Sequence, residues 1–514
     1  MKIKIAIVLL LTVNFCFLQV IVNAQDSIQI HKITFEEAWT ITNNNSHVVK
    51  QTDYLRQEKE EMLKSVKGLY FPKIGITASF MDMSKDLTLD LTPVKNAITP
   101  LYSTLANYGN FSSVPNPDPN TNKILPVLPE NLSTAGVRGK LNDGLNEIQN
   151  ANWNQMLQKK QFGVLATTFQ WPIFVGGKIG IANNVAKIER NEVDEITLQK
   201  QGELLSELVE RYFGLCLAKQ AVCVRLEVYN GMAKHLQDAE KMEKEGLVAS
   251  ADVLHAHVFF SQSLRELTKA KRMVDIINKS LTSTLVTFDG ENIEPVSELF
   301  YLDTVPSLQY FSEAALTKNP LLLQVSSKML LSMQKIKAER AEYYPEIALQ
   351  GMYTIADMYL SPYTPKWVAG VGLKWTLFDG TARSRKVSAA LLKAKEVDEI
   401  QMKAQSDITT VVAKLYNELK MYKEQLDELD VAVHYAEEYV RVRDKAFQEE
   451  MSNATEVVDA NLALAQVRIE RLQAMYNFDL TLAKLLQMSG LPDEFRNYRL
   501  GANMKQESYN IPVK

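Results

Sequence analysis

The sequence predicts a mostly helical, internally duplicated chain that combines long coiled-coil helices with four membrane-spanning strands. Three observations support this fold class. Motifs recur at one spacing, proline-free segments carry a seven-residue apolar repeat, and segments of about ten residues alternate between apolar and polar side chains. Four strands cannot close a barrel, and an open sheet edge is not tolerated in lipid. Copies of the chain are therefore expected to supply the remaining strands, and the pattern allows two, three or four copies.

Residues 1–24 have the features of a secretory signal peptide. Lys2 and Lys4 precede an apolar run over residues 5–22, which is followed by small residues suited to cleavage. We therefore expect the mature protein to be exported. Cys16 lies inside the apolar run without the small neighbours that lipidation signals carry, so lipid attachment is not expected.

Two parts of the chain repeat the same motifs. The segment 171–176 corresponds to 375–380, with a tryptophan, a phenylalanine and a glycine conserved between them, and the segment 249–254 corresponds to 453–458. Both pairs are separated by 204 residues. One spacing for two separate motifs indicates that a single structural unit was duplicated.

A third pair of motifs locates an insertion in the first copy. Tyr-Phe-Pro at 70–72 matches Tyr-Tyr-Pro at 343–345, but this separation is 273 residues. We place the extra residues of the first copy within 81–161. This segment is rich in proline and asparagine, which predicts an irregular loop with a short helix around 141–159. It could plug the mouth of the barrel, bind a surface partner or do neither.

These motifs divide the mature chain into four parts. The first repeat occupies 25–285 and the second occupies 310–490. Residues 286–309 contain glycine and two prolines, which predicts a link of mixed structure near the middle of the helices. Residues 491–514 form a C-terminal tail.

The longest predicted helices lack proline and carry apolar residues at alternating steps of three and four, which is a heptad seam. Each long helix has about 65 residues and ends at a turn, near 246–250 or 451–454, from which a second helix returns. The predicted helices are 34–67, 178–245, 250–285, 310–342, 382–449 and 454–488. The first seam consists of Leu205, Leu208, Tyr212, Leu215, Val222, Leu226, Tyr229, Ala233 and Leu236, with Lys219 as its interruption. The second consists of Ile408, Val412, Leu415, Leu419, Tyr422, Leu426, Leu429, Val433, Ala436 and Val440.

Between the helices the apolar period changes to two, which is typical of strands. The four candidate strands are 74–80, 165–173, 347–355 and 367–377. Trp171, Trp367 and Trp375 lie near strand ends, as aromatic side chains at a membrane interface do. A half-buried soluble sheet is the alternative, but the adjoining helices continue as coiled coils and leave the apolar side uncovered.

Composition and motifs argue against nucleic-acid binding and catalysis. The formal net charge of −4 comes from interspersed acidic and basic residues, so there is no basic stripe for nucleic acid. Cys216 and Cys223 are about 10 Å apart along one predicted helix, too far for a disulfide. His255 and His257 lie on different faces of a helix, and no catalytic motif is present. We therefore predict no enzyme, no cofactor and no metal site.

The sequence resembles the outer-membrane efflux protein family, the TolC-like channels. The resemblance rests on the duplication, on Trp-Pro-Ile-Phe-Val-Gly-Gly at 171–177, on Trp-Thr-Leu-Phe-Asp-Gly at 375–380, and on Gly-Leu-Val-Ala at 246–249 followed by Asp252. It implies a homotrimer with a 12-stranded barrel in outer-membrane lipid and an α-helical barrel across the periplasm. It also implies an exit duct for a tripartite efflux pump or a type I secretion system, working with a periplasmic adaptor and an inner-membrane pump.

The resemblance also implies a gate at the hairpin tips. In the family a tyrosine and an arginine of the second hairpin bond an aspartate of the first. Asp252 matches the aspartate, whereas Phe447 lacks the hydroxyl and Ser452 lacks the charge of their counterparts, so the closed state is held more weakly or by residues such as Lys244. Glu456 and Asp459 align with acidic rings at the family's entrance, where carboxylates favour cations. Solvated helix-surface charges are the alternative interpretation.

The family's adaptor-binding tips correspond to Gly246, Leu247 and Val248 in the first hairpin and to Met451 and Ser452 in the second. A periplasmic coiled-coil adaptor or structural protein without a channel is the competing function, although its strands would not repeat symmetrically with its helices. A passive porin is disfavoured because this chain uses most of its residues in helices. The cargo is left open, because in this family the pump and adaptor select it.

Overall fold

The computed structural model describes residues 30–107, 115, 118–120, 132–287, 291–449, 451–501 and 504–506. The predicted signal peptide at 1–24 and much of the C-terminal tail lie outside these residues. The chain divides into two compact units. The helical unit comprises Met1–Val66, Gly180–Arg340 and Thr381–Lys514, and the sheet unit comprises Lys67–Ile179 and Ala341–Gly380. None of the helices in the described ranges is both long and apolar enough to span a bilayer.

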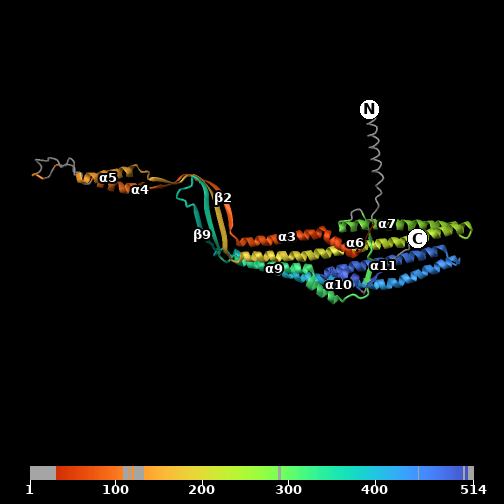
Figure 1. Cartoon of the computed structure of the whole chain (residues 1–514). Helices are drawn as coiled ribbons and strands as arrows, with labels where there is room; N and C mark the ends of the chain where they lie inside the picture. The colour runs from red at the N-terminus through yellow and green to blue at the C-terminus, as the bar shows by residue number, and fades with distance from the viewer. Residues whose placement is uncertain are drawn as a thin grey trace, which may run out of the picture. The chain divides into compact units, whose positions relative to one another are not determined.

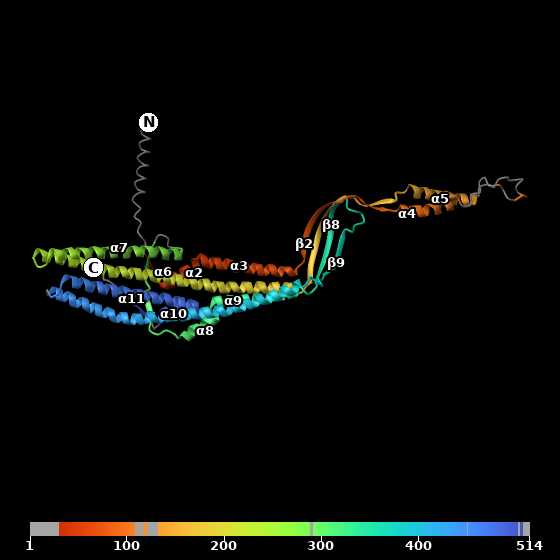
Figure 2. The same cartoon turned by 180° about the vertical axis from the view of Figure 1, so that it is seen from behind.

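Two helical hairpins dominate the helical unit (Figures 1 and 2). The first pairs α6 (Lys178–Lys244) with α7 (Ser250–Leu285), and the second pairs α10 (Ala382–Gln448) with α11 (Ala454–Met488). Both long helices have 67 residues. All four helices agree with the sequence prediction to within one residue, because no proline interrupts any of them.

The heptad seam of α10 is confirmed, since every predicted position is buried or half-buried. In α6 every predicted position is likewise buried or half-buried, but only the positions as far as Leu215 are buried. Beyond Lys219, which forms an ion pair with Glu294, the fully buried positions are Val224, Val228, Met232, His235 and Ala239. The predicted positions in this part are half-buried, because α6 contacts both α7 and α11 and so buries more than one stripe.

The two shorter predicted helices are each broken in two, which the sequence did not predict. Ser46 separates α2 (Phe35–Asn45) from α3 (His47–Lys67), and Asn319 separates α8 (Leu308–Lys318) from α9 (Pro320–Ala341). Both are buried and cap the following helix: the Ser46 hydroxyl accepts from Val48 N at 3.1 Å and the Asn319 carbonyl oxygen from Leu321 N at 2.9 Å. The two breaks have the same 273-residue separation as the Tyr-X-Pro motifs.

The core of the helical unit forms where the chain ends and the inter-repeat link cross the long helices. β1 (Ile30–Ile33) pairs in parallel with β6 (Asn292–Pro295), and β7 (Phe300–Leu302) pairs with β10 (Met504–Gln506). Tyr212 of α6 donates to Ile33 O at 2.7 Å and accepts from Ser297 N at 3.0 Å. The buried rings packed here are Phe35, Tyr212, Phe213, Phe300 and Phe495. The short helix α12 (Glu494–Leu500) contributes the last ring.

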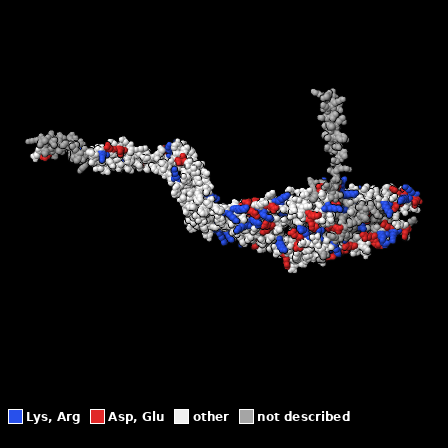
Figure 3. Space-filling view, in the orientation of Figure 1, with Lys and Arg blue, Asp and Glu red and all other residues white. Residues whose placement is uncertain are grey.

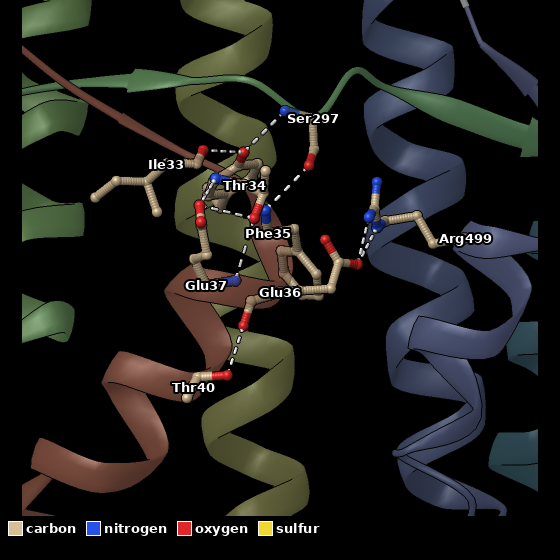
Figure 4. A network of polar contacts seen from close by, with 9 residues as sticks. Ile33, Thr34, Phe35, Glu36, Glu37, Thr40, Ser297 and Arg499 are labelled. Carbon is tan, nitrogen blue, oxygen red and sulfur yellow. Dashed lines mark hydrogen bonds and ion pairs between the residues drawn. The ribbon is translucent and has the colours of Figure 1, made fainter.

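Polar contacts fix the start of α2 in this core (Figure 4). Thr34 and Glu37 form a capping box, with Glu37 N donating to the Thr34 hydroxyl at 3.3 Å and Thr34 N donating to the Glu37 carboxylate at 2.9 Å. Phe35 N donates to the Ser297 hydroxyl at 3.0 Å. Arg499 donates to Glu36 at 2.7 Å, so α2, the inter-repeat link and α12 are joined at one place.

The sheet unit contains one antiparallel four-stranded sheet in the order β2, β5, β8, β9. The strands are β2 (Lys73–Asp82), β5 (Gln161–Val175), β8 (Glu346–Met358) and β9 (Trp367–Lys374), and a 3-10 turn at Gly68–Tyr70 precedes the first. All four predicted strands are present. The fourth ends at Lys374 instead of residue 377, because Lys374 pairs with Glu346, the first residue of β8, and no strand residue lies beyond it.

The two copies make the same contact at the end of this sheet. Trp171 Nε1 donates to Tyr70 O at 2.9 Å, and Trp375 Nε1 donates to Tyr343 O at 3.1 Å. Each bond joins the Trp motif to the Tyr-X-Pro motif of the same copy. The duplication inferred from spacing is therefore visible in matching hydrogen bonds.

The insertion at 81–161 is more regular than predicted. It contains the hairpin strands β3 (Leu87–Asp90) and β4 (Asn154–Gln158), and between them the paired helices α4 (Thr92–Asn107) and α5 (Leu132–Asn150). The predicted helix at 141–159 was wrong at both ends, because its last residues belong to β4. Proline did not exclude a helix here: Pro93 lies in the first turn of α4, where no intrahelical N–H bond is required, and Pro100 lies inside the helix, where it leaves one intrahelical hydrogen bond unmade.

Candidate functional site

The candidate site lies at the two hairpin tips of the helical unit. Gly246, Leu247 and Val248 form the turn between α6 and α7, where Gly246 has a φ of +78° that favours glycine. Leu247 is 57% exposed. Met451 and Ser452 lie in the turn between α10 and α11, and Met451 is 71% exposed. Each tip thus presents a large apolar side chain to its surroundings.

An acidic residue lies in the first turn of the returning helix at each tip. The Asp252 carboxylate accepts from Ala249 N at 3.2 Å in the first turn of α7. At the equivalent place in α11, Asn453 is the N-cap and its side chain accepts from Glu456 N at 2.9 Å. Negative charge in the first turn of a helix is stabilising because it faces unpaired backbone N–H groups.

Glu456 is also bonded by two further residues of its own hairpin. Its carboxylate accepts from Arg443 Nη1 at 2.6 Å and from the Ser452 hydroxyl at 2.6 Å. Sequence reasoning missed Arg443. Residues at equal distances from a hairpin turn face each other, and this relation could have identified Arg443 as the partner of Glu456. These two contacts occupy the Glu456 carboxylate, which was predicted to line an entrance. Asp459, the other acidic residue predicted there, is exposed one turn further along α11.

Three predicted gate residues surround one cavity of about 410 Å³ between the tips. The cavity is lined by Ala239, Met242, Leu247, Val248 and Asp252 of the first hairpin and by Phe447, Ser452, Asn453 and Thr455 of the second. The structure therefore places Asp252, Phe447 and Ser452 around the same space. Mixed apolar and polar lining is suited to two surfaces that meet and separate.

Phe447 packs against the first hairpin through His235. Their ring centroids are 5.8 Å apart at an interplanar angle of 63°. His235 is 8% exposed, and burial lowers its pKa, opposed by the nearby charge of Asp238. A buried imidazole against an aromatic ring therefore joins Phe447 to the first hairpin, and His235 was not recognised from the sequence.

A charged residue further from the tips links the two hairpins directly. Arg468 of α11 donates to Glu227 of α6 at 2.6 Å and to Glu437 of α10 at 2.9 Å. Its side chain is 14% exposed, while the two glutamates are about half exposed. One guanidinium on α11 thus bonds carboxylates from two other helices, which is a geometry that arginine provides and lysine does not.

Comparison with known proteins agrees with this architecture. Residues 311–491 match the model of the outer membrane efflux protein family. This match covers about a third of the chain, the part that contains the second repeat. The chain also shares 21% identity over 269 residues with protein CyaE of Bordetella pertussis, and it covers 56% of that relative's length.

Solved outer-membrane channels share the fold of this chain at low sequence identity. It is similar to CmeC of Campylobacter jejuni (TM-score 0.65, 11% identity, covering 91% of this chain and 89% of that one). It is also similar to MtrE of Neisseria gonorrhoeae in its open state (TM-score 0.64, 12% identity, covering 89% of this chain and 89% of that one). A third similar structure is VceC of Vibrio cholerae (TM-score 0.62, 13% identity, covering 89% of this chain and 96% of that one).

The three tryptophans predicted to lie at a membrane interface are all in the sheet unit and are exposed. Trp171 and Trp375 lie at the end of the sheet where each bonds its Tyr-X-Pro motif, and they are 42% and 54% exposed. Trp367 begins β9, opposite Tyr353, and is 67% exposed. In the described ranges no group of three metal-binding side chains comes together.

Proposed function

We propose that the protein is an outer-membrane exit duct in which three copies close one 12-stranded β-barrel. The sheet carries this proposal. Among the described strands its edges, β2 and β9, have no further neighbour. An open edge would leave backbone N–H and C=O groups unpaired in lipid, whereas β9 of one copy can pair with β2 of the next.

The two faces of the sheet support lipid on one side and water on the other. One face carries large exposed apolar side chains, including Ile74, Ile76, Val371 and Leu373, whose exposures are 72%, 71%, 67% and 64%. The other face carries Gly75, Thr77, Ser79, Thr168, Gly370 and Gly372. The visible surface of the strands is nearly free of charged residues, whereas the helices carry both signs (Figure 3). Trp171 and Trp375 at one end and Trp367 at the start of β9 would mark the membrane interfaces.

In this proposal the helical hairpins of the three copies form a tunnel in the periplasm. The tips at 246–248 and 451–452 bind a periplasmic adaptor, which connects the duct to an inner-membrane pump. The duct serves a tripartite efflux pump or a type I secretion system. Exposed Leu247 and Met451 supply apolar surface for the adaptor.

The periplasmic end is closed in this proposal when the two hairpins of each copy contact each other. Phe447 packed on His235 and the ion pairs of Arg468 hold them together, and adaptor binding separates them. Glu456 and Asp459 lie near the entrance and favour cations. The gate thus relies on an arginine and an aromatic contact in place of the family's tyrosine and arginine.

Cross-linking tests the barrel. Thr77→Cys in β2 and Val368→Cys in β9 lie on the same face of the sheet, at its two edges. With a flexible bismaleimide we expect trimers from outer-membrane fractions of the double variant and no oligomer from either single variant. Recovery of uncross-linked protein in the soluble periplasmic fraction would contradict the proposal.

A further inference from the structure

The inserted helix pair is joined to the membrane sheet by an unbroken series of backbone contacts. The β2–β5 ladder ends at Asp82 and Gln161, and Met83 N then donates to Lys160 O at 2.8 Å. The β3–β4 hairpin follows, and Leu91 N donates to Trp153 O at 2.7 Å directly before α4. The insertion is therefore a regular extension of two barrel strands.

Helix α4 has an apolar stripe that does not face α5. Val94, Ile98, Leu101 and Leu105 recur at steps of four, three and four, which is the spacing of a coiled-coil seam. Three of them are exposed: Val94 by 48%, Leu101 by 58% and Leu105 by 44%. A different side of α4 faces α5. It includes Ala106, which is buried, and Tyr102, whose ring lies near Gly144 of α5.

This stripe carries no charge. Lys95 is the one charged residue among the 16 of α4, and its ammonium group donates to Gln149 O at 3.0 Å. A solvent-facing helix normally places charged side chains on its outer face. Exposed leucines at heptad spacing on an uncharged face indicate a helical partner with a matching apolar stripe.

Charged residues between the sheet and the helix pair argue against lipid as the covering surface. Lys85, Asp86, Lys159 and Lys160 lie where β2 and β5 leave the apolar sheet, and Lys160 N donates to Asp86 at 2.6 Å. Such residues belong in water beyond the hydrocarbon. We propose that the partner of α4 is a second copy of itself, so that the stripes of neighbouring subunits pack together at the outer end of the barrel. This inference rests on the proposed trimer, which brings three identical insertions to one rim.

Cysteine scanning of α4 in the full-length protein tests this packing. Leu101→Cys and Leu105→Cys probe the stripe, and Asn96→Cys is the matched control, exposed and about 140° around the helix from Leu101. The background carries Cys223→Ser, while native Cys216 is buried and burial raises the pKa of its thiol. With a short bismaleimide on outer membranes we expect cross-linked dimers from both stripe variants, at least about tenfold more than from Asn96→Cys.

The β2–β9 cross-link separates failure of this inference from failure of the duct. If Thr77→Cys with Val368→Cys still gives trimers while the stripe variants do not cross-link, the packing of α4 is wrong and the barrel stands. Equal cross-linking at Leu101→Cys and Asn96→Cys would also overturn it, because random collision would then explain both. A cross-link from Leu101→Cys to a different protein would assign the stripe to that partner instead.

Discussion

The two copies of the repeat have the same arrangement of helices and strands, but different side-chain interactions stabilise them. At positions separated by 204 residues, the first copy has Ala239, Leu226 and Leu267 where the second has Arg443, Asp430 and Arg471. Ala239 packs with Val253 and Ala256 in a small apolar cluster, whereas Arg443 bonds Glu456. The first hairpin is thus held by apolar packing at places where the second is held by ion pairs.

This difference indicates which hairpin is easier to move. Apolar packing is lost gradually and is insensitive to salt, whereas an ion pair is strong only at close range and can be replaced by water. The second hairpin also supplies Arg468, the charged link to the first. At these positions the second copy therefore carries ion pairs that salt or a competing partner can break, and substitutions at equivalent positions test this.

The largest effect is expected at Asp479, whose equivalent in the first copy is the exposed Asp275. Asp479 is fully buried, accepts from Phe300 N at 3.3 Å, and burial raises its pKa well above the usual value, opposed by that bond and by Arg499. A raised folded pKa means that stability is fully present below about pH 4 and is lost as pH rises toward the folded value. Asp479→Asn should remove this pH-dependent loss of stability, because asparagine carries no charge. The difference should be large, since an uncompensated buried charge costs several kcal/mol.

Urea unfolding of the purified protein at several pH values measures the effect of Asp479→Asn. The stability of the variant relative to wild type should increase steadily from about pH 4 upward. The stability of Asp275→Asn, at the exposed equivalent position, should differ from that of wild type by the same amount at every pH. Parallel curves for both variants would show that Asp479 does not titrate in a buried site.

The second effect concerns buried Arg471 and its partner Asp430, whose side chain is 39% exposed, at the positions of two leucines in the first copy. Arg471 is 5% exposed and donates to Asp430 at 2.5 Å, while Asp430 also accepts from the Tyr301 hydroxyl at 3.0 Å. Asp430→Leu leaves a buried guanidinium without its partner and should cost about 3 kcal/mol in urea unfolding. The double variant with Arg471→Leu copies the first hairpin and should recover most of that loss. Equal losses in the single and double variants would show that the copies are not interchangeable here.

The third effect concerns the gate. Arg468→Met removes the bonds to Glu227 and Glu437, and two charge-assisted bonds to half-exposed carboxylates are expected to contribute about 1.4 kcal/mol to the closed state. Open probability in planar bilayers should rise about tenfold. The control is Arg441→Gln, which loses an exposed bond to Glu438 within one helix. An unchanged open probability for Arg468→Met would remove it from the gate.

The sequence predicted the long helices and the strands well because local patterns determine them. Residues 178–244 lack proline throughout, and 367–374 alternate strictly between faces. The break at Ser46 was missed because serine is tolerated within helices. The break at Asn319 has a local signal that was overlooked, since Pro320 is the first residue of α9 and proline disfavours a helical conformation at the residue before it. A distant contact also holds Asn319, its side-chain NH₂ donating to Met488 O at 2.7 Å.

The site was predicted only in part, for a similar reason. Asp252, Phe447 and Ser452 were found by resemblance to a family motif, and the structure places them around one cavity. Arg468 and His235 belong to no such motif. Their roles depend on which helices pack together, and a heptad pattern shows that a helix packs without identifying its neighbour.

The smallest effect is expected at Arg443, where the two tips differ most clearly. Arg443→Ala gives the second tip the residue of the first and removes a bond of 2.6 Å to Glu456, which is 38% exposed. The expected cost is about 1 kcal/mol because solvent screens the pair, and it should shrink in high salt. Limited proteolysis near residues 449–453 at low and high salt measures this cost. Ala239→Ser at the first tip should give a cleavage rate that does not respond to salt. If high salt instead changes the cleavage rate equally at both tips, ion pairing does not distinguish the two hairpins.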